Sequence, residues 1–236
     1  MIAVGQATHR GHHREQNEDS VLAAYPVFAV ADGMGGHAAG EIASAIAVET
    51  LGALAGGVLT DTAALIATVQ EANRRICEAS RHPGQRGMGT TLTGCAELAD
   101  GSWATFNVGD SRVLLIHEGE VRQITTDHSE VQDMVTLGIL APDEAAVHPM
   151  RHIVTRSLGG RTEVAIDVER IEVGAGDRLL VCSDGLTDEV PPDELYWVLE
   201  SARDPQDAAD ALVQAALGAG GHDNVTVVVI DILSQD

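Results

Sequence analysis

The feature of this sequence that most constrains its fold is a succession of short apolar runs, each about as long as a β-strand. The runs lie at 27–31, 90–97, 102–108, 112–116, 121–124, 165–173, 178–182 and 224–233. Short apolar runs that are bounded by turn residues favour strands over helices. Glu118-Gly119 is a hairpin-turn signal between two of the runs. The sequence therefore predicts a fold dominated by β-sheet.

Apolar residues at helical spacing are confined to a few segments that follow one another in pairs. They predict helices at 41–54 and 62–79, a short helix at 129–137, and two late helices at about 193–201 and 205–217. Because these helices do not alternate with the strands, the pattern argues against a doubly wound α/β fold. We predict an α+β fold with two packed sheets and helices outside. Since no linker, repeat or low-complexity segment interrupts the chain, we expect one domain over 1–236.

The charge balance excludes some partners. The chain carries 36 acidic residues against 14 basic ones, all arginine, for a net charge of −22. Such a chain is repelled by the phosphates of nucleic acids and by anionic membrane surfaces. No stretch approaches the roughly 20 apolar residues that span a bilayer, and residues 1–10 lack the pattern of a signal peptide. We therefore expect a cytoplasmic protein with no nucleic-acid or membrane partner.

The cysteines agree with that compartment. Cys77, Cys95 and Cys182 are widely separated, and their number is odd. This arrangement fits neither a disulfide framework nor the ligand spacing of a zinc site. We expect buried free thiols, as in proteins of a reducing compartment.

Four aspartates stand at the ends of the apolar runs. Asp32 and Asp184 each end one run, Asp110 follows another, and Asp223 directly precedes the last. Taken singly, each is explained by ordinary turn chemistry, because Asp-Gly after an apolar run is a common turn signal. If the strand ends converge at one edge of a sandwich, however, the carboxylates collect and repel one another. A hard divalent ion such as Mg²⁺ or Mn²⁺, which prefers oxygen ligands, removes that conflict.

Neighbouring residues refine this hypothesis. Zinc is disfavoured because the histidines lack close ligand pairing, and the adjacent His12 and His13 would point apart in a strand. The glycine-rich turn after Asp32 lets backbone carbonyls approach an ion closely. Arg14 precedes the acidic segment 17–19. It could form a surface ion pair with a neighbour such as Glu18, or bind phosphate oxygens in a bidentate manner through its guanidinium group. The local sequence leaves both interpretations open.

Six segments, in order along the chain, together carry a family resemblance. They are R-E-Q-N-E-D at 14–19, V-A-D-G-M-G-G-H at 30–37, G-M-G-T-T-L at 87–92, N-V-G-D-S-R at 107–112, C-S-D-G-L-T-D at 182–188 and G-H-D-N-V-T-V-V at 221–228. The chain resembles the metal-dependent protein serine/threonine phosphatases of type 2C, in their compact bacterial form. The resemblance implies a central β-sandwich of two mainly antiparallel sheets flanked by pairs of helices. It also implies one catalytic domain, with a mobile flap at about 128–156.

The resemblance implies a set of catalytic metal ligands. Asp32 would bridge two central ions of Mn²⁺ or Mg²⁺, and Gly33 would contribute its backbone carbonyl. Asp184 and Asp223 would complete the first metal site. The ions would activate a water that attacks phosphorus in line with the leaving oxygen.

The remaining implied site residues surround this pair of ions. Glu18 and Asp19 would lie on or just behind the second metal. Asp110 would help to hold a third ion, to which His152 would lend its backbone carbonyl. Arg14 would bind the substrate phosphate and so take part in catalysis.

One feature departs from the eukaryotic branch of the family. That branch carries a histidine directly after the Asp-Gly pair, where this chain has Met34. The proton donor to the leaving serine or threonine oxygen therefore stays open, with His37 and a metal-activated water as candidates.

The resemblance implies partners as well as chemistry. The substrates would be phosphorylated proteins, including a serine/threonine kinase and its targets, and the chain would act as a monomer. One alternative is a phosphatase dedicated to a single regulatory phosphoprotein, such as a sigma-factor antagonist. Another is a catalytically weak binding module that presents the fold to a kinase. The presence of all four aspartates argues against the binding module, since degenerate members lose them.

Overall fold

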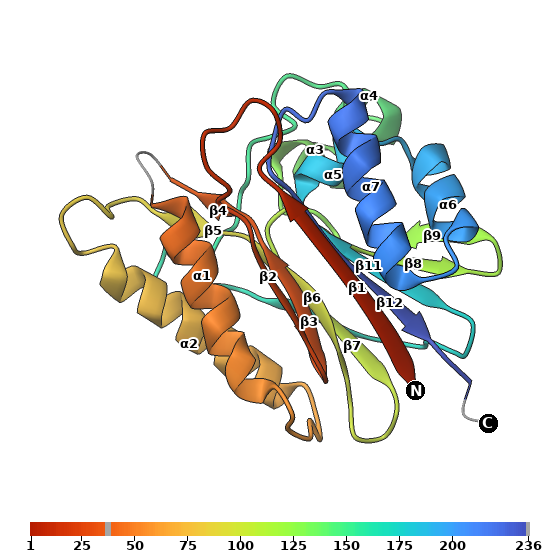
Figure 1. Cartoon of the computed structure of the whole chain (residues 1–236). Helices are drawn as coiled ribbons and strands as arrows, with labels where there is room; N and C mark the ends of the chain where they lie inside the picture. Colours follow the sequence, from red (N-terminus) through yellow and green to blue (C-terminus); the bar gives the residue numbers. More distant parts are fainter. Residues whose placement is uncertain (36–38, 235–236) are drawn as a thin grey trace.

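Two five-stranded sheets, packed face to face, form the centre of the computed structural model, which describes residues 1–35 and 39–234 (Figure 1). The first sheet contains, in spatial order, β1 (Ile2–His9), β12 (Val225–Ile232), β11 (Arg178–Cys182), β8 (Arg112–His117) and β9 (Glu120–Gln123). The second contains β10 (Asp167–Ile171), β7 (Trp103–Val108), β6 (Leu92–Glu97), β3 (Val27–Ala31) and β2 (Ser20–Ala24). A small ladder pairs β4 (Gly33–Met34) with β5 (Gly89–Thr90). Neighbouring strands in these sheets pair antiparallel.

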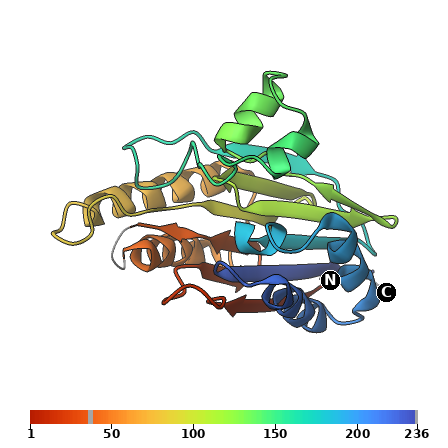
Figure 2. The ribbon, with the colours of Figure 1, turned by 90° about the horizontal axis from the view of Figure 1, so that it is seen from above.

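Pairs of helices cover the outer faces of the sandwich (Figures 1 and 2). α1 and α2 pack on the second sheet, whereas α6 and α7 pack on the first. The helices are α1 (Gly40–Leu51) with the 3₁₀ turn η1 (Gly52–Leu54), α2 (Ala63–Ala79), α3 (Glu130–Thr136), α4 (Pro142–Ala146), α5 (Asp184–Thr187), α6 (Pro192–Ser201) and α7 (Pro205–Ala219). In Figure 2 the green segment that contains α3 and α4 projects beyond these layers.

The period of two along each strand separates the core into layers. In β3, Val27 and Ala29 face the α1–α2 side, whereas Phe28 and Val30 face the first sheet. Successive side chains of a strand point to opposite faces of its sheet, so an apolar run with no polar interruption is buried on both faces. β3 is fully buried along its length for this reason. The prediction of a two-sheet core covered by helices on both sides is therefore confirmed.

Local sequence signals explain several element boundaries. Ser129 begins α3 as an N-cap, since its hydroxyl accepts a hydrogen bond from the Gln132 amide at 3.3 Å. Asp204 caps α7 in the same way, and Pro205 occupies the first turn of that helix. Glu118 and Gly119 have φ values of 48° and 85°, which the two-residue turn between β8 and β9 requires.

The structure also differs from the sequence predictions. β1, β2 and α4 were not predicted, because their apolar residues are interrupted by polar and small ones. The run at 90–97 is divided between β5 and β6 at Thr91, whose amide donates to the Asp32 carbonyl. His12 and His13 lie in a turn after β1 and not in a strand, so that part of the argument against zinc was wrong.

Strand register places the aspartates at one end of the sandwich. Ser20 pairs with Ala31, so that Asp19 and Asp32 leave the second sheet side by side. Cys182 pairs with Val227, which brings the start of α5 next to the segment before β12. Within the described ranges, no helix is both long and apolar enough to cross a membrane.

Candidate active site

A cleft of about 1120 Å³ opens where these strand ends meet. It is polar and predominantly acidic. The predicted site residues that line the cleft are Arg14, Glu18, Asp32, Gly33, Asp110, His152, Asp184 and Asp223. Asp19 lies behind the wall of the cleft, where its Oδ2 accepts a hydrogen bond from the Ser183 hydroxyl at 2.9 Å. The structure therefore brings all the predicted residues of the described chain into one region.

Thr91 joins the segments that carry Asp32 and Asp110. The Asp32 amide donates to Thr91 Oγ1 at 3.0 Å, and the Thr91 amide donates back to the Asp32 carbonyl at 2.9 Å. Gly109, directly before Asp110, has a φ of 115° and packs so tightly that an added Cβ would lie 2.6 Å from the Thr91 side chain. Only glycine satisfies both conditions. Thr91 thus fixes the backbone segments that carry the two aspartates relative to each other.

Gly33 fills a similar role on the other side of Asp32. A Cβ at this position would collide with the backbone carbonyls of Glu18 and Gly40. The Gly33 amide also donates to the Glu18 carbonyl at 3.2 Å. This close approach of three backbone segments is the geometry that the glycine-rich turn was predicted to allow.

Asn224 fastens the loop at 10–18 against the start of β12. Its side-chain oxygen accepts from the Glu18 amide at 2.8 Å, and its Nδ2 donates to the carbonyls of Arg10 and Gln16. Arg14, on this loop, donates to Asp223 Oδ2 at 2.6 Å. The suggested partner Glu18 was therefore wrong. Because the Arg14 side chain is 54% exposed, this ion pair contributes little to stability.

Burial and mutual repulsion raise the pKa values of the clustered carboxyls. Burial, followed by the charges of Asp19 and Asp184, holds the pKa of Asp32 well above its usual range. Burial raises the pKa of Asp19 to about 7 even though hydroxyl groups bond to it. Burial and the neighbouring acids raise the pKa of Asp184 to about 6 and that of Asp110 to about 7. Crowded acids of this kind favour protons or a cation.

The donor atoms of the cluster suit a hard divalent cation. Asp19 Oδ1 and Asp184 Oδ1 are buried and, within the part of the chain that is described, have no hydrogen-bond partner. Buried polar oxygens without partners are rare and call for an explanation such as an ion. The lining offers carboxylate and carbonyl oxygens and no cysteine sulfur, and this is the donor chemistry of Mg²⁺ and Mn²⁺.

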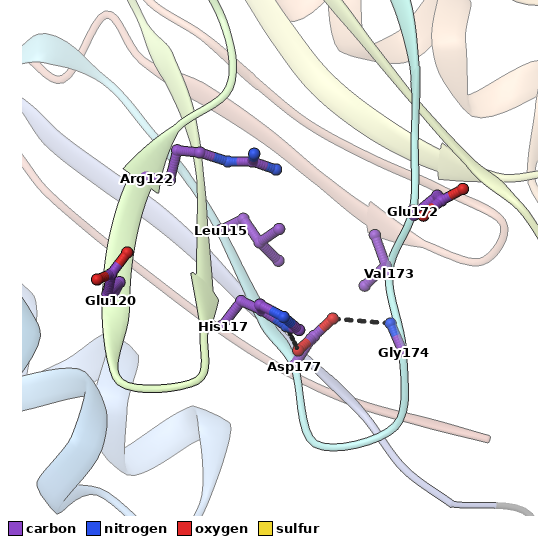
Figure 3. A pocket seen from close by; sticks show the side chains of 8 residues that line it. All are labelled: Leu115, His117, Glu120, Arg122, Glu172, Val173, Gly174 and Asp177. Atoms are coloured by element: carbon purple, nitrogen blue, oxygen red, sulfur yellow. Dashed lines mark hydrogen bonds and ion pairs between the residues drawn. The ribbon is translucent and has the colours of Figure 1, made fainter.

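A second cavity, of about 510 Å³, lies at the opposite end of β8 (Figure 3). There His117 Nδ1 lies 2.6 Å from Asp177 Oδ1, and Asp177 Oδ2 accepts from the Gly174 amide at 2.7 Å. Leu115 and Val173 supply apolar lining. The buried carboxylate of Asp177 therefore has a partner for each of its oxygens, in contrast to Asp184 in the first cleft.

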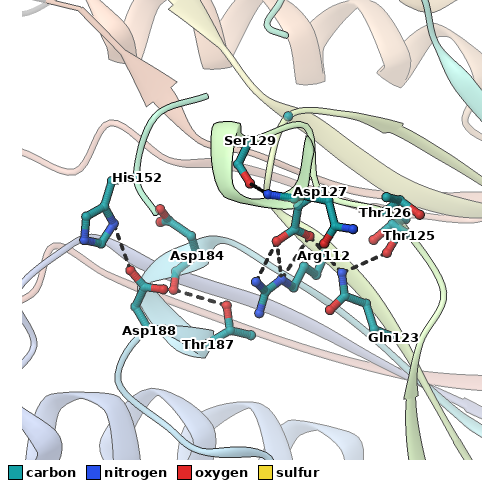
Figure 4. A network of polar contacts seen from close by, with 12 residues as sticks. Arg112, Gln123, Thr125, Thr126, Asp127, Ser129, His152, Asp184, Thr187 and Asp188 are labelled. Carbon is teal, nitrogen blue, oxygen red and sulfur yellow. Dashed lines mark hydrogen bonds and ion pairs between the residues drawn. The ribbon is translucent and has the colours of Figure 1, made fainter. Parts of the chain in front are cut away.

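Asp188 is a site residue that the sequence analysis missed. Among the described residues, one group of three potential ligands has its atoms within 4.8 Å of one another, and it consists of His152, Asp184 and Asp188. His152 Nδ1 lies 3.1 Å from Asp188 Oδ2 (Figure 4). Asp184 begins the short helix α5 instead of a simple turn, so residues four apart lie on one side of it. The D-G-L-T-D spacing was the signal that could have identified Asp188.

Two histidines named in the sequence analysis remain, His152 and His37. For His152 the resemblance implied a backbone carbonyl ligand, whereas the contact in the structure is made by the imidazole. His37, one candidate for the proton donor, lies outside the described residues.

The fold and the site together define the class of protein, a sandwich of antiparallel sheets with an acidic cleft whose oxygen donors suit hard divalent cations. The model of the family described as protein phosphatase 2C matches residues 7–217. The chain belongs to the protein phosphatase 2C family, as the motifs predicted.

Relatives and solved structures agree with this assignment. The serine/threonine protein phosphatase PstP of Mycobacterium tuberculosis is 43% identical over 234 residues, which cover 96% of this chain. The chain spans 44% of the length of that relative. The crystal structure of the M. tuberculosis phosphatase PstP/Ppp superimposes with a TM-score of 0.94, at 39% identity and 99% coverage of both chains. The catalytic domain of PstP in complex with two manganese ions gives a TM-score of 0.89, also at 39% identity and 99% coverage of both chains.

Proposed function

We propose that this chain is a protein phosphatase that hydrolyses phosphoserine and phosphothreonine on other proteins with the help of Mn²⁺ or Mg²⁺. The observation that carries the proposal is the convergence of acidic side chains in and directly behind one cleft. Two of them, Asp19 and Asp184, have a buried oxygen with no hydrogen-bond partner among the described residues. An arginine stands at the edge of this cleft and supplies the charge that a phosphate monoester needs.

Two central ions and a third fit the distribution of oxygen donors. Asp32, the Gly33 carbonyl, Asp184 and Asp223 would hold the central pair, with Glu18 and Asp19 beside or behind them. Asp110 and the His152 segment would hold the third ion. When bound, such ions activate water and offset the charge that develops on the phosphoryl group.

The chain's own side chains would orient the substrate. Arg14 projects from a loop that Asn224 fixes, so its guanidinium can meet the phosphate oxygens at the mouth of the cleft. The segment 128–156, with α3 and α4, borders the cleft through Arg151, His152 and Ile153, and we assign it the role of a mobile flap that contacts the phosphoprotein. The chain 1–236 would thus act as one catalytic domain.

We further propose the partners and the setting of this activity. The substrates would be phosphoproteins, including a serine/threonine kinase and its targets, in the cytoplasm, with the phosphatase acting as a monomer. The relatives named serine/threonine protein phosphatases support the substrate class. A phosphatase dedicated to one regulatory phosphoprotein would share the same chemistry. Comparing phosphoproteins with and without the gene distinguishes the two, since a dedicated enzyme changes a single one.

The first expected result concerns metal removal. Purified protein should hydrolyse p-nitrophenyl phosphate and a phosphothreonine peptide in Mn²⁺ or Mg²⁺, and EDTA should abolish both reactions, because the acidic cluster needs its counter-ions for catalysis. Alkylation of the thiols serves as the control and should leave activity in place, since Cys95 and Cys182 are buried. Full activity in EDTA would rule out the metal-dependent mechanism.

Substitution of Arg14 should affect substrate binding more than the chemical step. We expect Arg14→Ala to raise KM clearly and to lower kcat less, because the phosphate oxygens that it binds are present in both substrate and transition state. A charge-assisted contact of this kind corresponds to about 1.5–3 kcal/mol, or roughly ten- to a hundredfold in kcat/KM. Arg14→Lys should recover only part of the loss, since it keeps the charge without the fork. Steady-state kinetics on a phosphothreonine peptide measures both constants, and unchanged values would leave Arg14 with only its ion pair to Asp223.

Asp110 should matter for turnover more than for the central ions. It lies on the β7–β8 turn, distant in sequence from the other aspartates, and is 7% exposed. We expect Asp110→Ala to keep two ions per chain by calorimetry and yet to be at least about tenfold slower, as is typical when a metal-site contact is lost. Unimpaired activity in this variant, with no third ion at any Mn²⁺ concentration, would remove Asp110 from the catalytic residues.

A further inference from the structure

His128 makes an unusually complete set of contacts with the turn that carries Asp110. Its own amide donates to the Gly109 carbonyl, and the Gly109 amide donates to its ring Nδ1, both at 2.9 Å. The residue is buried, with 6% of its surface exposed. Because a backbone amide can only donate, Nδ1 accepts and carries no proton, which places the ring proton on Nε2. Two hydrogen bonds therefore join His128 and Gly109, and each residue is the donor in one of them.

The other side of the His128 ring reaches the second sheet. Nε2 donates to Asp167 Oδ2 at 3.1 Å, and the remaining oxygen of Asp167 accepts from Arg156 at 2.6 Å. The imidazole thus lies between the Asp110 turn and the start of β10. Both of its nitrogens have a partner, so its orientation is fixed.

The backbone of His128 also closes the segment 128–156 at its base. The Thr155 amide donates to the His128 carbonyl at 2.8 Å, and Ser129 forms a β-bridge with Val154. The Glu130 amide donates to the Ile153 carbonyl at 3.0 Å. Nearby, Arg112 makes a forked ion pair with Asp127, with a shortest distance of 2.6 Å, and fastens the preceding residue to β8 (Figure 4).

We propose that His128 is a positioning residue, which fixes the Gly109–Asp110 turn against the base of the segment 128–156 through its amide and its ring Nδ1 and so sets the place of the Asp110 carboxylate in the cleft. This inference rests on the proposed function, since it concerns Asp110 as a catalytic carboxylate. Residues that orient a metal-site side chain through a hydrogen bond affect activity although they do not touch the substrate. A small shift of the Gly109–Asp110 turn would displace the Asp110 carboxylate, whereas β7 and β8 would stay paired with their neighbouring strands.

Two substitutions of His128 each keep one of the two hydrogen bonds of the ring and remove the other. In His128→Asn, the amide oxygen takes the place of Nδ1 and can still accept from Gly109, but the donor to Asp167 is lost. In His128→Gln, the amide nitrogen reaches the place of Nε2 and can still donate to Asp167, but the acceptor for Gly109 is lost. Both variants replace the ring with an uncharged amide, which makes each the control for the other.

We expect the two variants to differ in turnover. With saturating Mn²⁺ and a phosphothreonine peptide, His128→Gln should lower kcat about tenfold or more, whereas His128→Asn should stay within about threefold of the wild type. KM for the peptide should change little in either, because His128 does not line the cleft. Ile230→Val, a core truncation in β12, should lower the melting temperature without this loss of kcat.

Hydrogen–deuterium exchange in EDTA tests the same contact without reference to activity. In His128→Gln, the peptide covering 107–112 should exchange faster than in the wild type, and in His128→Asn it should not. The peptide covering 225–232 should be unchanged in both. Equal losses of kcat in the two variants, or wild-type kcat and protection in His128→Gln, would overturn the proposal. A wild-type protein that is inactive on the phosphopeptide would overturn the proposed function, while the exchange experiment would still decide the contact between His128 and Gly109.

Discussion

Asp184→Asn and Asp32→Asn are each expected to lower kcat by more than about a hundredfold, because residues that merely orient a metal ligand already cost ten- to a hundredfold when changed. Each substitution removes one charge and retains the shape of the side chain. Both residues line the cleft, and Asp184 has a buried oxygen that no described residue contacts by a hydrogen bond. Steady-state kinetics on a phosphothreonine peptide in saturating Mn²⁺ measures the loss.

The same substitutions should not unfold the protein. Replacing a carboxylate in a cluster of like charges relieves repulsion, so the melting temperature in EDTA should be equal to or higher than that of the wild type. In Mn²⁺, by contrast, the variants should gain less thermal stability than the wild type, since they bind the ion less tightly. A fall of the melting temperature in EDTA that parallels the loss of kcat would assign these residues a structural role instead.

Glu169→Gln is the matched control for the removal of one acidic charge. Glu169 lies on β10 with its side chain exposed, away from the cleft. We expect activity close to that of the wild type and a stability change within about 0.5 kcal/mol, as for most surface substitutions. Comparable losses of activity in Glu169→Gln and Asp184→Asn would show that net charge, and not position, governs turnover.

Much of the fold could be predicted from sequence because the buried strands are continuous apolar runs. β3 and β11 each follow an apolar run, and they end one residue before Asp32 and two residues before Asp184. β1 escaped prediction because its burial comes from partners far along the chain. It pairs with β12, and α7 packs against Gly5 so closely that a Cβ there would meet the Pro205 backbone. No window of sequence around β1 contains that information.

Residues of the candidate site could be predicted where a sequence motif marked them, but not where their position depends on the packing of the folded chain. Asp32, Asp110, Asp184 and Asp223 were found because each follows or precedes an apolar run. Asp188 was missed because its position depends on α5 beginning at Asp184, and a single Asp-Gly pair does not distinguish a helix start from a turn.

Polar contacts between distant segments were the least accessible to sequence reasoning. The partner of Arg14 is Asp223, 209 residues away, and the nearby Glu18 was only a guess from proximity. The contact of His128 with Gly109 likewise joins two residues that lie 19 positions apart and meet only in the folded chain. Such pairs become visible only once the strand ends have converged.

The pH dependence of stability should reverse when metal is removed. In EDTA we expect the free energy of unfolding to fall as the pH rises from about 5 to 8. The folded-state pKa of Asp110 is about 7, above the value of 3.8 expected for an unfolded chain. Between those values the folded protein holds a proton that the unfolded chain has released. The stabilisation is therefore complete below the unfolded pKa and is lost as the pH rises through the folded one. Asp19 and Asp184, with pKa values of about 7 and 6, act in the same direction.

In Mn²⁺ the slope should have the opposite sign, because an ion binds the deprotonated carboxylates and binds more tightly as the pH rises. Thermal denaturation at intervals between pH 5 and 8, with EDTA and with Mn²⁺, measures both curves. For Asp110 alone the shift corresponds to at most about 4 kcal/mol, so Asp110→Asn should visibly flatten the EDTA curve. His117, whose bond to Asp177 raises its pKa, contributes a background in the same direction, which the comparison of wild type with Asp110→Asn cancels. An EDTA curve that rises with pH, or one that Asp110→Asn leaves unchanged, would contradict the crowding of acids that the site is proposed to use.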